Sequence, residues 1–153
     1  MYNIWISAKI ISSSENPLAN IYKSYDWWEK AISIALKTAD RYEFRLWSDD
    51  VKSIEDISLL GEKIDNFETN ELVYKGLIDD RIKRLLLNDY LTSSGYIKWF
   101  TVNLYRNDEL KFYSSHYGEE VAITVNNYNE ALDVKKMMEQ SFSVEEVWID
   151  EVI

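Results

Sequence analysis

His116 is the only histidine in the sequence, and histidine is the side chain that most often acts as a general base. Ser114 and Ser115 precede it and aspartates are plentiful, so the residue types of a Ser-His-Asp triad are present. The serines are not set in the strand–turn–helix pattern that exposes a nucleophile. We therefore expect His116 to be a surface residue at the end of a strand.

Other catalytic chemistry has less support. Paired carboxylates such as Asp49 and Asp50 can hydrolyse glycosides or bind hard cations, but pairs are expected among 27 acidic residues, and a loop or helix start explains this one. The four scattered glycines exclude a phosphate-binding loop and a dinucleotide-binding fingerprint. The lack of cysteine excludes disulfides and thiolate catalysis, and the single histidine excludes a histidine-rich metal site. We expect no catalytic residue, no cofactor and no metal, and so favour a binding protein over an enzyme.

The C-terminal quarter of the chain is strongly acidic. Between Glu119 and Ile153 there are nine acidic residues and two lysines, so this segment carries −7 of the net charge of −10. Such a balance disfavours binding to nucleic acid or to an anionic membrane, and it indicates either a solvated face or a basic partner. The candidate partner-binding residues here are Glu130, Asp133, Glu145, Glu146, Trp148, Asp150 and Glu151.

The stretch 97–117 is the second candidate for binding. β-branched and aromatic residues alternate on both sides of a polar turn at 106–109, which predicts a central β-hairpin. One face is expected to join the core and carries Phe100, Val102, Leu104, Leu110 and Phe112. The other is aromatic but not apolar, as surfaces that meet a partner are, and carries Trp99, Thr101, Asn103, Tyr105, Lys111, Tyr113 and Tyr117. Its candidate anchors are Trp99, Tyr105 and Tyr113. The alternative is that most of the six tryptophans and eleven tyrosines serve as bulk in the core.

Strands and helices that would position these residues are interspersed along the chain. Besides the hairpin, alternation predicts strands at 4–12, 41–47, 72–74, 120–125 and 144–152. Apolar spacing and capping residues predict helices from Ser24 or Asp26, over 53–60, over 77–91 and after Asn127. The last helix is expected to bury Tyr128, Ala131, Leu132, Met138 and Phe142. Hairpins outnumber possible crossovers, so we predict an α+β fold in one domain spanning residues 1–153. It would have a mixed or mainly antiparallel sheet built around the central hairpin, with helices packed on one face.

The sequence also predicts the compartment. The N-terminus lacks the basic and apolar regions of a signal peptide, and no run approaches the roughly 20 apolar residues that span a bilayer. A chain without cysteine suits a reducing compartment. We therefore expect a soluble, cytoplasmic protein.

The chain resembles a known family in three stretches, SYDWWEKAISIAL, IKWFTVNLYRNDELKFY and NYNEALDVKKMMEQSFSVEEVWIDEVI. In these, and as a small, acidic, cysteine-free domain rich in Trp and Tyr, the chain resembles the immunity proteins of bacterial contact-dependent growth inhibition and related polymorphic toxin systems. The resemblance is one of overall pattern and covers the whole chain. It implies a protein that binds a cognate toxin domain, often a nuclease, in the cytoplasm and blocks its active site or substrate access. Acidic groups with aromatic anchors suit a basic toxin surface.

Two other classes remain open. A phage-encoded acidic inhibitor that mimics nucleic acid would be similarly acidic and without catalytic motifs. A small enzyme acting on a cationic substrate would need a deep pocket lined by carboxylates with shifted pKa values.

Overall fold

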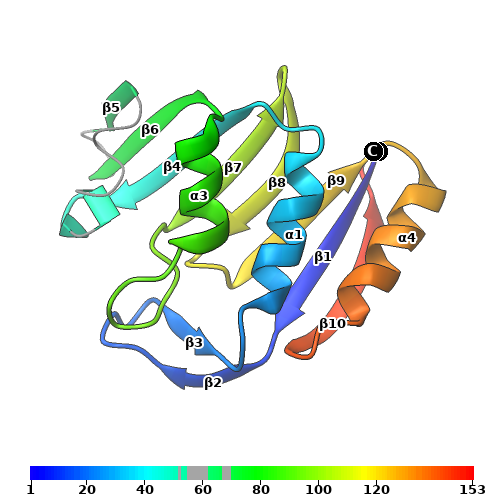
Figure 1. Cartoon of the computed structure of the whole chain (residues 1–153), viewed down its shortest axis with the longest axis horizontal. Helices are drawn as coiled ribbons and strands as arrows, with labels where there is room; N and C mark the ends of the chain where they lie inside the picture. The colour runs from blue at the N-terminus through cyan, green and yellow to red at the C-terminus, as the bar shows by residue number, and fades with distance from the viewer. Residues whose placement is uncertain (52, 55–61, 67–69) are drawn as a thin grey trace.

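A single antiparallel sheet of eight strands forms the centre of the computed structural model, which describes residues 1–51, 53–54, 62–66 and 70–153 (Figure 1). The strand order is β10-β1-β9-β8-β7-β4-β6-β5, and β2 and β3 form a separate hairpin. The strands are β1 (Tyr2–Ala8), β2 (Ile10–Ser13), β3 (Asn20–Tyr22), β4 (Arg41–Trp47), β5 (Glu62–Asn66), β6 (Glu71–Leu77), β7 (Thr101–Arg106), β8 (Glu109–Ser115), β9 (Glu120–Val125) and β10 (Val144–Glu151).

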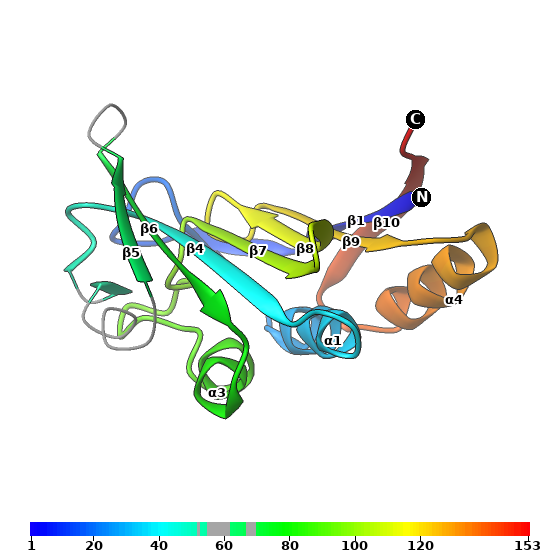
Figure 2. The ribbon, with the colours of Figure 1, turned by 90° about the horizontal axis from the view of Figure 1, so that it is seen from above.

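Helices α1 (Asp26–Leu36), α3 (Asp80–Asn88) and α4 (Tyr128–Glu139) lie on the same side of this sheet (Figure 2). We call the side that they cover the helix face and the opposite side the open face. In α1 the buried residues follow helical spacing, and the Trp28 indole Nε1 donates a hydrogen bond to the Leu86 carbonyl of α3 at 2.9 Å. The predicted α+β fold, with an antiparallel sheet and helices on one face, is confirmed.

The core lies between the helices and the sheet. Apolar residues pair across neighbouring strands, as Ile4 does with Ile123, Ile123 with Phe112, and Phe112 with Leu104. Ile4, Leu104 and Phe112 have no exposed surface, and the helices close over them. Because side chains alternate along each strand, the intervening residues must lie on the open face. None of the described helices is long and apolar enough to cross a lipid bilayer.

The central hairpin is shorter than its sequence pattern predicted. Val102, Leu104 and Phe112 are fully buried, as expected. The prediction that Trp99 lies on the exposed face of the hairpin was wrong. Trp99 lies before β7 begins and is fully buried, and its ring stacks on that of Phe44 with centroids 4.6 Å apart. The prediction was wrong in the same way for Tyr117, which follows β8 and is 1% exposed. The alternation rule applies only within a strand, and both residues lie where the chain has left the sheet.

The bounds of several other elements agree with the prediction. Strands β4 and β9 and the start of α1 lie where they were expected, and 72–74 is the middle of β6. The strand predicted over 4–12 is divided into β1 and β2. The helix predicted over 77–91 is only Asp80–Asn88, because Asp79 caps it, accepting a hydrogen bond from the Ile82 backbone N–H at 3.0 Å. Strands β3 and β5 were not predicted. The helix predicted over 53–60 lies mostly outside the described residues.

Helix α4 begins as predicted but buries a narrower stripe. Asn127 Oδ1 caps it by accepting a hydrogen bond from the Glu130 backbone N–H at 2.8 Å. Ala131, Val134 and Met138 are the buried residues of α4. The expected burial of Tyr128, Leu132 and Phe142 was wrong, because all three are exposed. Helix α4 packs over β10, β1 and β9 at one edge of the sheet, where only one row of its side chains reaches the core. Phe142 lies beyond the last turn of the helix.

Candidate functional site

An aromatic row crosses the open face from β10 to β8. In the strand register Trp148 pairs with Trp5, Trp5 with Ala122, and Ala122 with Tyr113. The Trp5 and Trp148 rings stack with centroids 6.3 Å apart and an interplanar angle of 16°, and Tyr113 meets Trp5 edge-on at 6.2 Å. The small side chain of Ala122 leaves the space in which the rings of Trp5 and Tyr113 meet. Trp148 is 39% exposed, so a partner can reach the row at this end.

Carboxylates surround this row. Three of them line a hollow of about 400 Å³ beside the two tryptophans, and a fourth, Glu146, belongs to the same side of β10 as Trp148. Tyr113 donates a hydrogen bond to Glu120 Oε2 at 3.4 Å. Within the described part of the chain, none of the four forms an ion pair with a lysine or an arginine. The acidic aromatic patch consists of Trp5, Tyr113, Trp148, Glu119, Glu120, Glu146 and Asp150.

On the β7–β6 half of the open face, two glutamates are paired with an arginine. Arg45 contacts Glu43 at 2.8 Å and Glu71 at 3.4 Å, and Glu43 also accepts hydrogen bonds from Asn103 at 3.3 Å and Tyr105 at 3.1 Å. Burial alone would raise the pKa of Glu43, but the hydrogen bond from Asn103 and the charge of Arg45 lower it. Tyr105 is therefore held in an internal polar network, which makes it a weaker candidate anchor than Tyr113.

The other predicted binding residues lie apart from the patch. Glu130 and Asp133 are exposed on α4, which covers the opposite face of the sheet. Glu145 lies at an irregularity in the β1–β10 register, and Glu151 ends β10. Trp99 is buried in the core and cannot contact a partner. The structure thus brings together Glu146, Trp148, Asp150 and Tyr113 from the predicted set.

Sequence reasoning missed three members of the patch, Trp5, Glu119 and Glu120. A signal for Trp5 was present, because it alternates with the apolar residues Ile4 and Ile6 and therefore faces away from the core. Nothing in the sequence indicated that β1 lies between β9 and β10, which brings Trp5 against Trp148.

His116 is exposed at the end of β8, as predicted. Ser115 Oγ lies 2.9 Å from His116 Nδ1, and Glu120 Oε2 lies 3.9 Å from the same nitrogen. A catalytic triad needs the acid on Nδ1 and the nucleophile on Nε2. The arrangement here is not that of a triad. In the described ranges, no three histidine, aspartate or glutamate residues are grouped so that they could hold a metal ion.

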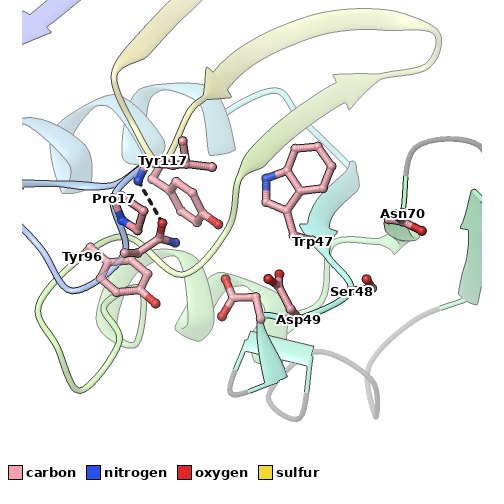
Figure 3. Close-up of a pocket in the computed structure, with 10 residues that line it drawn as sticks. Pro17, Trp47, Ser48, Asp49, Asn70, Tyr96 and Tyr117 are labelled. Carbon is pink, nitrogen blue, oxygen red and sulfur yellow. Dashed lines mark hydrogen bonds between the residues drawn. The ribbon is translucent and has the colours of Figure 1, made fainter.

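A recess of about 520 Å³ lies at the end of the sheet where β4 ends (Figure 3). Trp47, Tyr96 and Tyr117 form its aromatic walls, and Asp49 and Asp50 contribute carboxylates. The labelled rings and the Asp49 carboxylate in Figure 3 surround a common space. Burial raises the pKa of Asp50, a hydrogen bond from Ser53 lowers it, and the nearby charge of Asp49 raises it further.

Comparison of the chain with protein-family models, with curated proteins and with solved structures gave no significant match.

Proposed function

We propose that this chain is an immunity protein that binds a basic toxin domain in the bacterial cytoplasm and neutralises it. The observation that carries the proposal is the stacked pair Trp5 and Trp148 on the sheet face that the described helices leave uncovered. The carboxylates around this pair form no ion pair with a lysine or arginine of the described residues. Large aromatic side chains that are partly exposed and close together are typical of binding hot spots.

The acidic residues of β10 have a second explanation. This strand is at the edge of the sheet, and charged side chains on edge strands prevent pairing with other chains. Edge protection accounts for Glu146 and Asp150, but it does not account for two tryptophans beside them. The combination of aromatic anchors with acidic neighbours therefore favours a specific partner over a merely solvated edge.

The distribution of charge favours a protein inhibitor over a mimic of nucleic acid. A mimic needs carboxylates spread over a large surface in place of phosphates. Here unpaired acidic groups gather around the aromatic row, while Glu43 and Glu71 both form salt bridges with Arg45. A basic protein with an apolar or aromatic contact of its own is the partner that fits this surface.

The first test is co-purification of the chain with the product of the gene directly upstream, where immunity systems encode the toxin. In the reconstituted complex, the double variant Glu146→Lys/Asp150→Lys should lower the association rate on the order of tenfold or more, and flatten its salt dependence. The reason is that carboxylates near the contact steer a basic partner over a Debye length of about 8 Å at physiological ionic strength.

The matched control is Glu130→Lys/Asp133→Lys, which changes the net charge by the same amount on α4. A patch-specific effect requires that this control change the rate much less. If both double variants slow association equally, net charge alone acts and the patch is not the binding site. If neither slows it, a basic partner at this face is ruled out.

A further inference from the structure

The recess at the end of β4 has features that the proposed immunity function does not use. It shares no lining residue with the acidic aromatic patch, and its walls come from five separate parts of the chain. These parts are the end of β4 with the residues after it, the loop at 16–18, Asn70 and the two segments that carry Tyr96 and Tyr117. Its volume falls within the range of about 300–1,000 Å³ that is usual for small-ligand sites.

The aromatic side chains that line the recess pack against one another. Tyr96 meets Tyr117 edge-on, with centroids 5.7 Å apart and planes at 82°. The Phe100 ring packs against Tyr117 and Trp47, with ring centroids 5.5 Å and 5.0 Å apart. This packing fixes the positions of three aromatic side chains that line one recess, and a cation near such rings is attracted to their π-faces.

Left-handed backbone occurs at three non-glycine residues in or beside the recess. His116 and Tyr117 have φ values of 52° and 56°, and Asn70 has a φ of 57°. Left-handed backbone is unfavourable for a bulky residue such as Tyr117, and such strain is typically found at functional sites. Here it turns the Tyr117 side chain inward, where it lines the recess and is 1% exposed.

The carboxylates give the recess a negative charge, and not all of its polar atoms are hydrogen-bonded. Asp50 Oδ2 is buried without a hydrogen-bond partner, and Trp47 Nε1 is buried and unpartnered as well. The charge of Asp50 also contributes, after burial, to the raised pKa of Tyr96 and of Tyr117, so both phenols stay protonated. A carboxylate oxygen without a hydrogen-bond partner, in a recess that aromatic rings also line, suits a positively charged hydrogen-bond donor.

The geometry points to a binding site for an organic cation, an alkylammonium or guanidinium group, held between Trp47, Tyr96 and Tyr117 and neutralised by Asp49 and Asp50. The cation has two possible sources, a free small molecule or a lysine or arginine side chain of a partner protein. This inference does not rest on the proposed function, because the two sites share no residue.

The test is a titration followed by the ¹H–¹⁵N resonances of the six tryptophan indoles, with Trp47 as the reporter. The probes are choline, N-acetyl-arginine methylamide and a Gly-Gly-Arg-Gly-Gly peptide. Neutral controls are 3,3-dimethylbutanol for choline and N-acetyl-citrulline methylamide for arginine. We expect a saturable shift of the Trp47 resonance with at least one cation, and none with its neutral counterpart. Saturation by choline or blocked arginine supports a free ligand, whereas saturation by the peptide alone supports a side chain of a partner.

Asp50→Asn and, separately, Asp49→Asn should weaken cation binding by about tenfold or more, because each removes one charged partner. Asp150→Asn is the matched control, since it removes the same charge from the acidic aromatic patch and should leave the titration unchanged. Melting temperatures from circular dichroism show that each variant is folded. The inference is overturned if no cation gives a saturable shift up to millimolar concentration. It is equally overturned if neutral probes bind as well, or if neither aspartate variant weakens binding.

Discussion

Two tryptophans of this chain show how the same side chain takes opposite roles. Trp99 is fully buried and stacks on Phe44, with centroids 4.6 Å apart and an angle of 14°. Trp148 is 39% exposed and stacks on Trp5 at the surface. Both lie in aromatic stretches of the sequence, but only one of them has its ring enclosed on all sides by the core. We therefore expect one to determine stability and the other to determine binding.

Trp99→Ala should lower the free energy of unfolding by about 3–5 kcal/mol, because it leaves a large cavity in the core. Trp148→Ala should lower it by no more than about 1–2 kcal/mol, which is the loss of one surface stacking contact. In a complex with the toxin partner that we propose, Trp148→Ala should instead raise the dissociation rate. Urea unfolding of both variants gives the first comparison, and surface plasmon resonance gives the second. If Trp148→Ala destabilises the fold as much as Trp99→Ala, the open face is structural packing and not a binding surface.

At the scale of elements, a single carboxylate joins the start of α1 to the segment between α4 and β10. Asp26 Oδ1 accepts hydrogen bonds from Ser24 Oγ at 2.6 Å and Ser143 Oγ at 2.8 Å, and Oδ2 accepts one from the Phe142 backbone N–H at 3.1 Å. Burial opposes ionisation of Asp26, but these hydrogen bonds outweigh it and lower its pKa. Its position in the first turn of α1 also suits the helix dipole.

Asp26→Asn should therefore lower stability at pH 7 by about 1–2 kcal/mol. The pKa of Asp26 is lower in the folded than in the unfolded chain, so its contribution is complete above the unfolded value of about 3.9 and disappears as the pH falls through the folded value. The difference between variant and wild type should shrink at pH 3. Urea unfolding at both pH values measures it, with the exposed Asp133→Asn as the control. A difference that is the same at pH 7 and pH 3 would contradict the assigned role of the charge.

For the whole molecule, the decisive feature is that one core extends beneath all three described helices. Its buried residues come from both halves of the sheet, from Ile4 and Val147 near one edge to Tyr74 near the other. A core that is continuous in this way does not offer a boundary along which half of the protein can unfold alone.

Unfolding in urea should consequently be a single cooperative transition. Far-UV circular dichroism reports the helices and the sheet, and tryptophan fluorescence reports a set of rings that includes Trp27, Trp28 and Trp99 in the core. The two curves should coincide in midpoint and slope. Separate midpoints would indicate that the sheet consists of two units with independent stability.

The sequence was sufficient where a pattern is local. The bounds of β4 and β9, the start of α1 and the capped start of α4 followed from alternation, helical spacing and a capping residue, which are properties of neighbouring residues. The pattern failed at the ends of the hairpin, because nothing local shows that the strand begins only after Trp99. It failed again in α4, where the width of the buried stripe depends on how much of the sheet lies beneath the helix.

The sequence by itself determined the composition of each face, because the positions of Trp5, Tyr113 and Trp148 within alternating strands direct them away from the core. Only the tertiary structure decided that they meet. The order β10-β1-β9-β8 pairs the first strand with the last, and this brings Trp5 against Trp148 although the two lie near opposite ends of the chain. The recess likewise gathers Trp47, Tyr96 and Tyr117 from separate segments. Which segments pair depends on the free energy of forming one common core. That free energy depends on residues far apart in the chain, so no short stretch of sequence determines the pairing.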